Sequence, residues 1–179
     1  MVTDTNSENK RLNAVAWVSH RLTHIPANRL GDEAMEDFVS HSSSIGRLWI
    51  HLAFKVKYSH RIFSIPEIKS RMEQLLWEAI NQLDIRCKEL GIDSDHVHFV
   101  LDIGFYPLPN IIKKLKGYTA KKLFQEYPQL KKQYFWGSGL WNPSYYFDSL
   151  GRDIDDMSRY VRKQGMPGDQ ATLAGFMNN

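Results

Sequence analysis

The segment His96–Ile103 constrains the fold of this chain more than any other, because its polarity alternates with a period of two. One side of the segment consists of Val97, Phe99, Leu101 and Ile103. The other side consists of His96, His98, Val100 and Asp102. Successive side chains of a β-strand point to opposite faces. The pattern therefore predicts a strand whose apolar face lies on the core and whose more polar face stays open.

The remaining patterns predict an α+β fold, a ferredoxin-like (RRM-like) βαββαβ sandwich with an antiparallel sheet and one added C-terminal helix. Apolar alternation and β-branched residues predict strands over residues 48–57, 85–90, 96–103 and 145–150. Apolar residues at helical spacing, with proline near two starts, predict helices over residues 66–79, 109–127 and 153–164. Gly91 is expected to mark a turn between two strands.

The chain is predicted to have three parts. Residues 1–40 form a partly disordered extension with a short helix over 12–22, residues 41–165 form the domain, and residues 166–179 form a flexible tail. No apolar run approaches the roughly 20 residues that cross a bilayer, so no membrane partner is expected. The polar N-terminus does not resemble a secretory signal, and the single cysteine, Cys87, excludes an intrachain disulfide. A cytoplasmic location is therefore expected.

Basic residues are concentrated in one stretch, although the net charge of the whole chain is only +3. Residues 113–132 hold seven lysines against a single acid, Glu126. A concentration of this kind favours a polyanionic partner such as DNA. A solvated, lysine-rich helix face explains the same charges without a partner, and charge alone leaves both interpretations open.

His96 and His98 are candidate metal ligands. Residues two apart on a strand share a face, so both imidazoles are expected to lie close together on the side away from the core. Two neutral imidazoles can bind a divalent metal when a further ligand converges on them. A His-x-His pair also arises by chance in a chain with seven histidines, but its place on the open face of a strand favours the metal site.

Tyr160 and Gln164 form a second candidate pair, on the last predicted helix. Residues four apart on a helix lie on one face, one turn from each other. A tyrosine phenol can act as a nucleophile once its proton is removed, and a glutamine carbonyl oxygen can bind a hard cation such as Mg²⁺. The plainer alternative is a tyrosine that packs the helix onto the sheet beside a surface glutamine.

Five short segments follow one another between about residues 46 and 165. They read HLAFKVKYSHRIF, DHVHFVL, IIKKLKGYTAKKLFQEYPQLKK, LWNPSYYFDSLG and RYVRKQ. In this order they resemble the single-tyrosine HUH transposases of bacterial and archaeal insertion sequences, the insertion sequence 200-like family. The second segment resembles the Asp-His-hydrophobic-His signature of these enzymes, and the last resembles the helix that carries the nucleophile. Each segment alone is weakly specific, whereas five in one order are specific.

The resemblance implies a role for each matching residue. His96, His98 and Gln164 match the metal ligands and Tyr160 matches the nucleophile, while Asp95 matches the acid before the histidines and would position them locally. Tyr145 and Tyr146 match the structural strand and not the catalytic position. The implied DNA contacts are Lys113, Lys114, Lys116, Lys121, Lys122, Arg162 and Lys163.

The resemblance also implies an activity. The family consists of metal-dependent transposases that use Mg²⁺ or Mn²⁺. The resemblance implies that this chain cleaves and rejoins single-stranded DNA through a 5′-phosphotyrosine intermediate. It also implies that the chain recognises hairpins at the ends of a mobile DNA element. A homodimer is implied, in which the tyrosine helix completes the partner subunit's site. Two alternatives stay open. A domesticated relative acting on repeated palindromic DNA would keep the same chemistry, and a non-catalytic single-stranded nucleic-acid-binding module would use a similar sheet.

Overall fold

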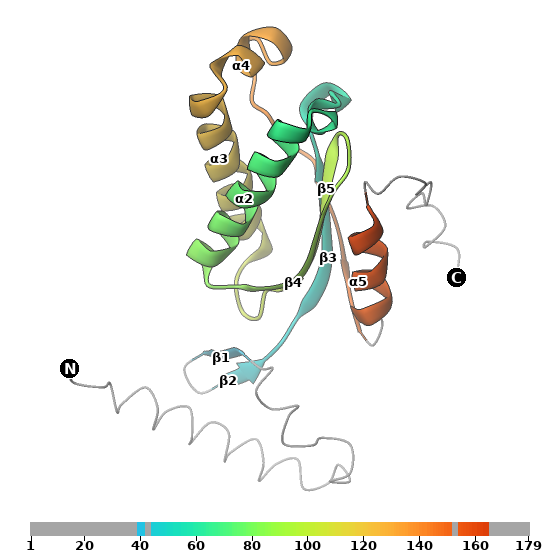
Figure 1. The fold of residues 1–179 in the computed structure, drawn as a ribbon. Coiled ribbons are helices and arrows are strands. Elements are labelled where there is room, and N and C mark those ends of the chain that lie inside the picture. Colours follow the sequence, from blue (N-terminus) through green and yellow to red (C-terminus); the bar gives the residue numbers. More distant parts are fainter. Residues whose placement is uncertain (1–38, 42–43, 152–153, 165–179) are drawn as a thin grey trace, which may run out of the picture.

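Four antiparallel strands form the central sheet of the chain, in the order β4-β5-β3-β6 (Figure 1). The strands are β3 (Trp49–Lys55), β4 (Arg86–Ile92), β5 (His96–Asp102) and β6 (Tyr146–Ser149). This computed structural model describes residues 39–41, 44–151 and 154–164. Because β3 and β5 lie in the middle of the sheet, each is hydrogen-bonded to a neighbouring strand on both edges. The polarity of each face decides what packs on it.

The helices lie on opposite faces of this sheet. Figure 1 shows α2 (Pro66–Leu83) and α3 (Leu108–Glu126) side by side on one face, and α5 (Ile154–Lys163) on the other. A shorter helix, α4 (Pro128–Tyr134), follows α3. Two short 3₁₀ turns, Lys57–Ser59 and Ile62–Ser64, connect β3 to α2. A small separate pair of strands, β1 (Val39–His41) and β2 (Ser44–Gly46), precedes the sheet.

The main core lies between the sheet and the pair α2 and α3. Alternate residues of β3 and β5 face it, and they include Ile50, Leu52, Phe54, Val97, Phe99 and Leu101. The amphipathic stripe of α2 meets them with Ile68, Met72, Leu75, Leu76, Ala79, Ile80 and Leu83. Burying a large aliphatic side chain contributes about 1.5–3 kcal/mol, so this stripe accounts for much of the docking of α2.

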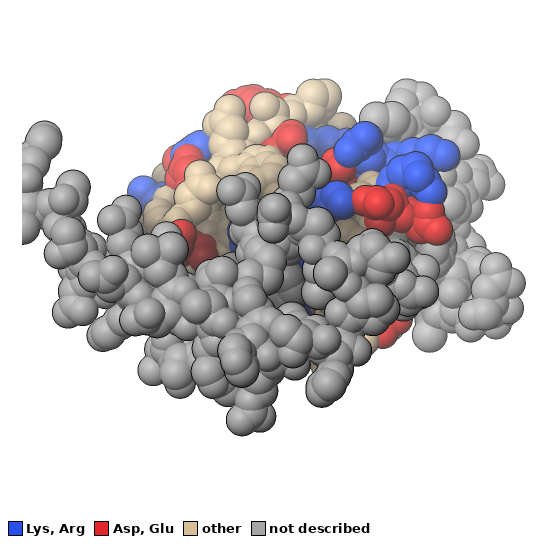
Figure 2. All heavy atoms as spheres, turned by 90° about the horizontal axis from the view of Figure 1, so that it is seen from below, with Lys and Arg blue, Asp and Glu red and all other residues tan. Residues whose placement is uncertain are grey.

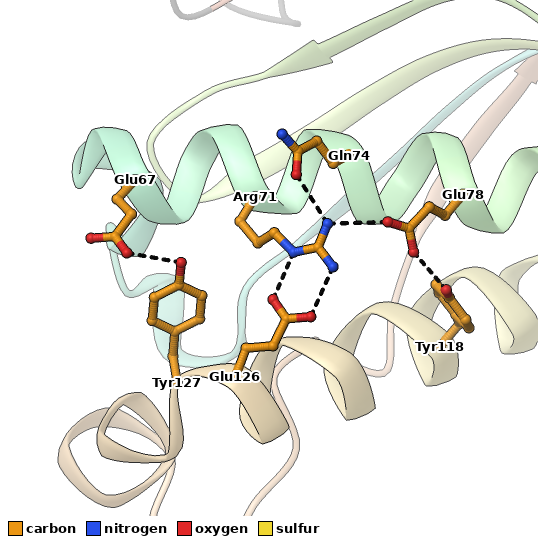
Figure 3. Close-up of polar contacts among 7 residues, drawn as sticks. All are labelled: Glu67, Arg71, Gln74, Glu78, Tyr118, Glu126 and Tyr127. Atoms are coloured by element: carbon orange, nitrogen blue, oxygen red, sulfur yellow. Dashed lines mark hydrogen bonds and ion pairs between the residues drawn. The ribbon is translucent and has the colours of Figure 1, made fainter.

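A polar network joins α2 to α3 along their outer edge (Figure 3). The Arg71 guanidinium donates to both carboxylate oxygens of Glu126, at 2.6 and 2.8 Å, and also to Glu78 on its own helix. Tyr118 donates to the other oxygen of Glu78 at 2.6 Å. Ion pairs this exposed contribute about 1 kcal/mol or less each, so the network supports the register of the helices more than their stability.

The sequence prediction of the fold class is confirmed, and the differences are local. Gly91, predicted to mark a turn, lies inside β4, and α4 begins where the chain was predicted to leave helical structure at Pro128. The predicted core residue Leu48 lies before β3 and is exposed. The helix predicted over residues 12–22, and Asp153 at the start of the last helix, lie outside the described residues. No helix in the described ranges is long and apolar enough to cross a membrane.

Candidate active site

Helix α5 covers the face of the sheet that the sequence predicted to be open. Its residues Met157, Tyr160 and Val161 form a small second core with Val100 of β5. The polar side of β5 is therefore buried, and His98 is only 2 % exposed. The alternation of β5 predicted the two faces correctly, but it carried no information on the amphipathic helix that returns to the second face.

His98 lies at the centre of this covered face. Its Nδ1 is 2.9 Å from Nε2 of His51 on β3, and its Nε2 is buried without a hydrogen-bond partner among the described residues. Burial, together with the neighbouring His96 and His51, lowers the pKa of His98 to about 3. His98 is therefore neutral at neutral pH, which is the form of imidazole that binds a metal.

His96 lies beside His98 and has a different partner. The two rings meet edge to face, with centroids 4.8 Å apart. Nδ1 of His96 lies 2.6 Å from a carboxylate oxygen of Asp95, and its Nε2 lies 3.7 Å from a carboxylate oxygen of Asp93. A carboxylate on one ring nitrogen orients a histidine so that the other nitrogen is directed at a ligand. This geometry suits the positioning role expected of Asp95.

Tyr160 packs against both buried histidines. Its ring stands edge-on to His98, with centroids 6.0 Å apart, and edge-on to His51, at 6.3 Å. The ring is almost fully buried. The predicted nucleophile and the predicted histidine ligands thus come together from α5 and β5, two elements separated by more than 50 residues.

Gln164, directly after α5, reaches the same site because β4 has no side chain at Gly91. Gly91 is paired with His98 across the strands, and a Cβ atom built on Gly91 would lie 3.1 Å from Cβ of Gln164. The same Cβ would collide with the carbonyl oxygen of Val161. Only glycine therefore lets the end of α5 approach the sheet this closely.

The Gln164 amide is the second buried polar group of the site without a partner. Its Nε2 has no hydrogen bond among the described residues, and the side chain is 8 % exposed. A half-turn of the amide would place its carbonyl oxygen at the same position, and such an oxygen binds hard cations. Buried polar groups are normally paired, so two orphaned atoms on adjacent side chains require an explanation.

The residues present fit a divalent cation. In residues 39–41, 44–151 and 154–164, no group of three His, Cys, Asp or Glu side chains is arranged to hold a metal ion. A site with three protein donors would therefore need a donor of another type. The imidazoles of His96 and His98 and the amide of Gln164 would provide three donors without a carboxylate, so the charge of the cation would stay available to an anionic substrate.

Two of the predicted DNA contacts have their charged groups engaged within the protein. The Lys116 ammonium donates to the carbonyl oxygens of Asn142 and Ser144, at 2.8 and 2.9 Å, and burial lowers its pKa to about 8. Lys116 therefore holds the segment before β6. The Arg162 guanidinium donates to Glu89 at 2.8 Å and ties α5 to β4. Both charged groups thus have partners within the protein, although the Arg162 side chain is exposed, and their contact with DNA stays a prediction.

The other predicted contacts remain exposed, and they are Lys113, Lys114, Lys121, Lys122 and Lys163. Lys113 and Lys114 line a groove of about 680 Å³ between α2, α3 and the loop at Tyr106. Viewed from the end at which β1 and β2 lie, the uncovered surface has basic and acidic side chains next to one another (Figure 2). Ion pairs of this kind include Lys88 with Asp155, at 2.5 Å. The exposed lysines of α3 are therefore better candidates for binding a polyanion than this surface, where acidic side chains lie next to the basic ones.

The sequence prediction missed His51 and Gly91. His51 stands in the first strand, between apolar residues that face the main core, and it is 1 % exposed. Its position in the alternation of β3 puts it on the same face as His98, which was a signal that the sequence contained. The sequence around Gly91 contained no such signal, because this glycine makes room for Val161 of α5, which lies 70 residues later in the chain.

A composite site completed by a partner subunit stays a prediction. Helix α5 packs on its own β4 and β5, and Tyr160 lies against the His98 of the same chain.

Comparisons with known proteins agree on one group. Residues 44–164 match the family model described as "Transposase IS200 like". The chain is 35 % identical over 120 residues to the ISDra2 transposase TnpA of Deinococcus radiodurans, covering 66 % of this chain and 84 % of that protein. It is similar to a crystal structure from Deinococcus radiodurans R1 assigned as a transposase, with a TM-score of 0.58 and 27 % identity over 71 % of this chain and 98 % of that one.

A further solved structure is a REP-associated tyrosine transposase bound to a REP hairpin. Its TM-score of 0.47 and its 10 % identity, over 64 % of each chain, are too low to carry an argument about this protein.

Proposed function

This chain belongs to the family of IS200-like transposases, and from that premise we propose that it cuts and rejoins single-stranded DNA with Tyr160 as the nucleophile. One observation carries the proposal. The Tyr160 ring stands edge-on to His98, whose Nε2 is buried without a partner among the described residues, and the side chain four residues later, Gln164, ends in a second such nitrogen. A merely structural tyrosine would not require unpaired polar atoms next to it.

The proposed reaction exchanges one phosphodiester for another. Tyr160 loses its phenolic proton, and its oxygen forms a bond to the phosphorus while the bond from phosphorus to the 3′-oxygen breaks. The products are a 5′-phosphotyrosine and a free 3′-hydroxyl, which takes up a proton. Attack by the 3′-hydroxyl of another strand reverses these steps and releases Tyr160. Because one ester replaces another, no nucleotide cofactor is needed.

The other residues of the site would bind the metal, orient its ligands and exclude water. His96, His98 and Gln164 would hold a divalent cation, Mg²⁺ or Mn²⁺, which would withdraw charge from the scissile phosphate. Asp95 orients the His96 ring through Nδ1. Burial of Tyr160 under α5 excludes water that would otherwise hydrolyse the covalent intermediate. The catalytic unit would span residues 41–165.

DNA would be held by the exposed lysines of α3 and by Lys163. Lysine–phosphate contacts are independent of base sequence and release counterions, so they suit the backbone of a folded hairpin. We expect binding that weakens steeply with salt. A homodimer would give each of two DNA ends its own catalytic tyrosine.

The test uses labelled single-stranded hairpin DNA from the flanks of the gene, incubated with the full chain and Mg²⁺ or Mn²⁺. We expect a covalent protein–DNA adduct on a denaturing gel, lost on chelation and in Tyr160→Phe. Tyr146→Phe is the matched control, because Tyr146 also contacts His51 but lies on β6. An adduct that survives in Tyr160→Phe would assign the reaction to another residue. Hairpin binding without any adduct would favour the non-catalytic module.

A further inference from the structure

His51 is the hydrogen-bond partner of His98, and the resemblance to the family assigned it no role. It lies on β3, and its Nε2 is 2.9 Å from Nδ1 of His98. The two rings are nearly coplanar, at 8°, with centroids 5.2 Å apart. Nitrogen atoms at 2.9 Å are closer than stacked rings allow, so the contact is an in-plane hydrogen bond and not a face-to-face stack.

A hydrogen bond between two neutral imidazole nitrogens contains one hydrogen. Either His98 donates from Nδ1 to the lone pair of His51, or His51 donates from Nε2 to the lone pair of His98. The first arrangement leaves a lone pair on Nε2 of His98, and the second leaves an N–H there. Nε2 of His98 is buried without an acceptor among the described residues, so a proton on this nitrogen would be an unpaired donor.

We infer that His51 is a positioning residue that accepts a hydrogen bond from Nδ1 of His98, and thereby keeps the lone pair of His98 on Nε2, facing the site. The inference deepens the proposed function and rests on it for the use of that lone pair. Two tyrosine rings also pack against His51. The ring centroids of Tyr146 and Tyr160 lie 5.8 and 6.3 Å from that of His51. Both contacts are edge-on and restrict rotation of the imidazole.

The two ligand histidines would then be oriented by different chemistry. His96 has a carboxylate on Nδ1, whereas His98 has a neutral imidazole there. A neutral acceptor suits the buried position, because a buried carboxylate would carry a large desolvation penalty. Loss of such an orienting partner typically weakens metal binding 10–100-fold.

Three variants test the inference. His51→Phe keeps the ring and removes the acceptor, and His51→Gln restores an acceptor near the position of Nε2. His60→Phe is the matched control, because His60 is a partly buried histidine that packs on Tyr134 and Phe135 away from this site. Long-range nitrogen–proton NMR of the metal-free protein reports which nitrogen of His98 carries the proton. Calorimetry with Mn²⁺ reports affinity, and circular dichroism reports folding.

We expect the proton on Nδ1 of His98 in the wild type, His51→Gln and His60→Phe, and a mixture of tautomers in His51→Phe. Mn²⁺ affinity should fall 10–100-fold in His51→Phe alone. A proton on Nε2 in the wild type, or an unchanged tautomer and affinity in folded His51→Phe, would overturn the inference. A proton on Nδ1 without any Mn²⁺ binding would support the hydrogen bond and overturn the metal site of the proposed function.

Discussion

At the scale of single residues, the candidate site is marked by buried polar atoms that have no hydrogen-bond partner among the described residues. His98 and Gln164 are buried on adjacent elements, and each ends in a nitrogen without a partner among the described residues. The buried hydroxyl of Thr119 on α3 is paired, by contrast: it donates to the Leu115 carbonyl and accepts from the Trp141 indole at 2.9 Å. The unpaired groups lower stability, and we attribute their retention to function.

Replacing Gln164 with leucine tests whether the unpaired group lowers stability and is required for activity. Gln164→Leu should raise the free energy of unfolding of the metal-free protein by about 1 kcal/mol, because it replaces a buried amide nitrogen without a partner among the described residues by an apolar group of similar volume. The same change should abolish the covalent DNA adduct. Chemical denaturation and the gel assay measure the two effects. Gln129→Leu, at an exposed position of α4, should change neither. A large loss of stability in Gln164→Leu would mean that the amide has a structural partner.

The buried histidines also predict how stability depends on pH. Burial lowers the pKa of His51 from 6.5 to about 4 and that of His98 to about 3. The unfolded chain therefore takes up protons first, so stability is complete above pH 6.5 and is lost as the pH falls toward 4. Each histidine should contribute roughly 1 kcal/mol per pH unit in that window.

Denaturant titrations of the chelated protein at pH 7, 6 and 5 measure this slope. His51→Gln should have a shallower slope than the wild type, because it removes one titrating ring. The lowered carboxylate pKa values of Glu78 and Glu126 affect stability only below their usual value of 4.5, outside this range. Equal slopes for the wild type and His51→Gln would contradict a neutral, buried His51.

At the scale of elements, the docking of α5 decides whether the site exists. The helix carries Tyr160, ends next to Gln164, and is joined to β4 by the pair Arg162 and Glu89. Its apolar side meets β5 at Val100. The close approach at Gly91 sets its depth on the sheet. A change of one methyl group at this contact should therefore move both the nucleophile and a predicted ligand.

Gly91→Ala should detach or tilt α5. The added Cβ would collide with the backbone of Val161, and overpacking of this kind destabilises by about 1–3 kcal/mol. Hydrogen exchange should speed up in α5 while α2 stays protected, and adduct formation should fall. Gly117→Ala on α3 is the control, because nothing lies within 4 Å of the added atom. It should stabilise by about 0.5–1 kcal/mol. If hydrogen exchange in α5 of Gly91→Ala is as slow as in the wild type, the contact between Gly91 and Val161 is not tight.

At the scale of the whole molecule, the sheet leaves β6 at an edge. In the part of the chain that the structure describes, β6 pairs only with β3. Its residue Phe147 is 53 % exposed, and the neighbouring Tyr145 lies 6.3 Å from it between ring centroids. An exposed edge with aromatic side chains is suited to pairing with a second copy of the same strand. The proposed homodimer would form a continuous sheet in this way.

Phe147→Lys should therefore shift the protein from dimer to monomer, because a lysine on the edge opposes strand pairing. Sedimentation velocity at several concentrations measures the state. Trp136→Lys is the control, because Trp136 is an exposed aromatic residue, 93 % exposed, outside the sheet. A wild type that is monomeric at all concentrations, or a variant that remains a dimer, would exclude this interface.

The sequence by itself determined the order of the main strands and helices and the two faces of β5, although it missed α4 and the place of Gly91 in β4. His96 and His98 share a face because a strand has a period of two, and α2 buries its stripe because a helix has a period of 3.6. These are local rules, and they predicted the ferredoxin-like order. They also predicted that Tyr160 of α5 and Gln164, directly after it, lie on one side.

Only the tertiary structure decided what those faces meet. His51 contacts His98 across 47 residues of sequence, Gly91 makes room for α5, and Lys116 holds the loop before β6 instead of facing solvent. Such partners depend on strand register and on where a distant helix returns, and a shift of one residue would reverse every face. The local period of a segment contains no information about its partner, so these contacts follow from the fold and not from the motif.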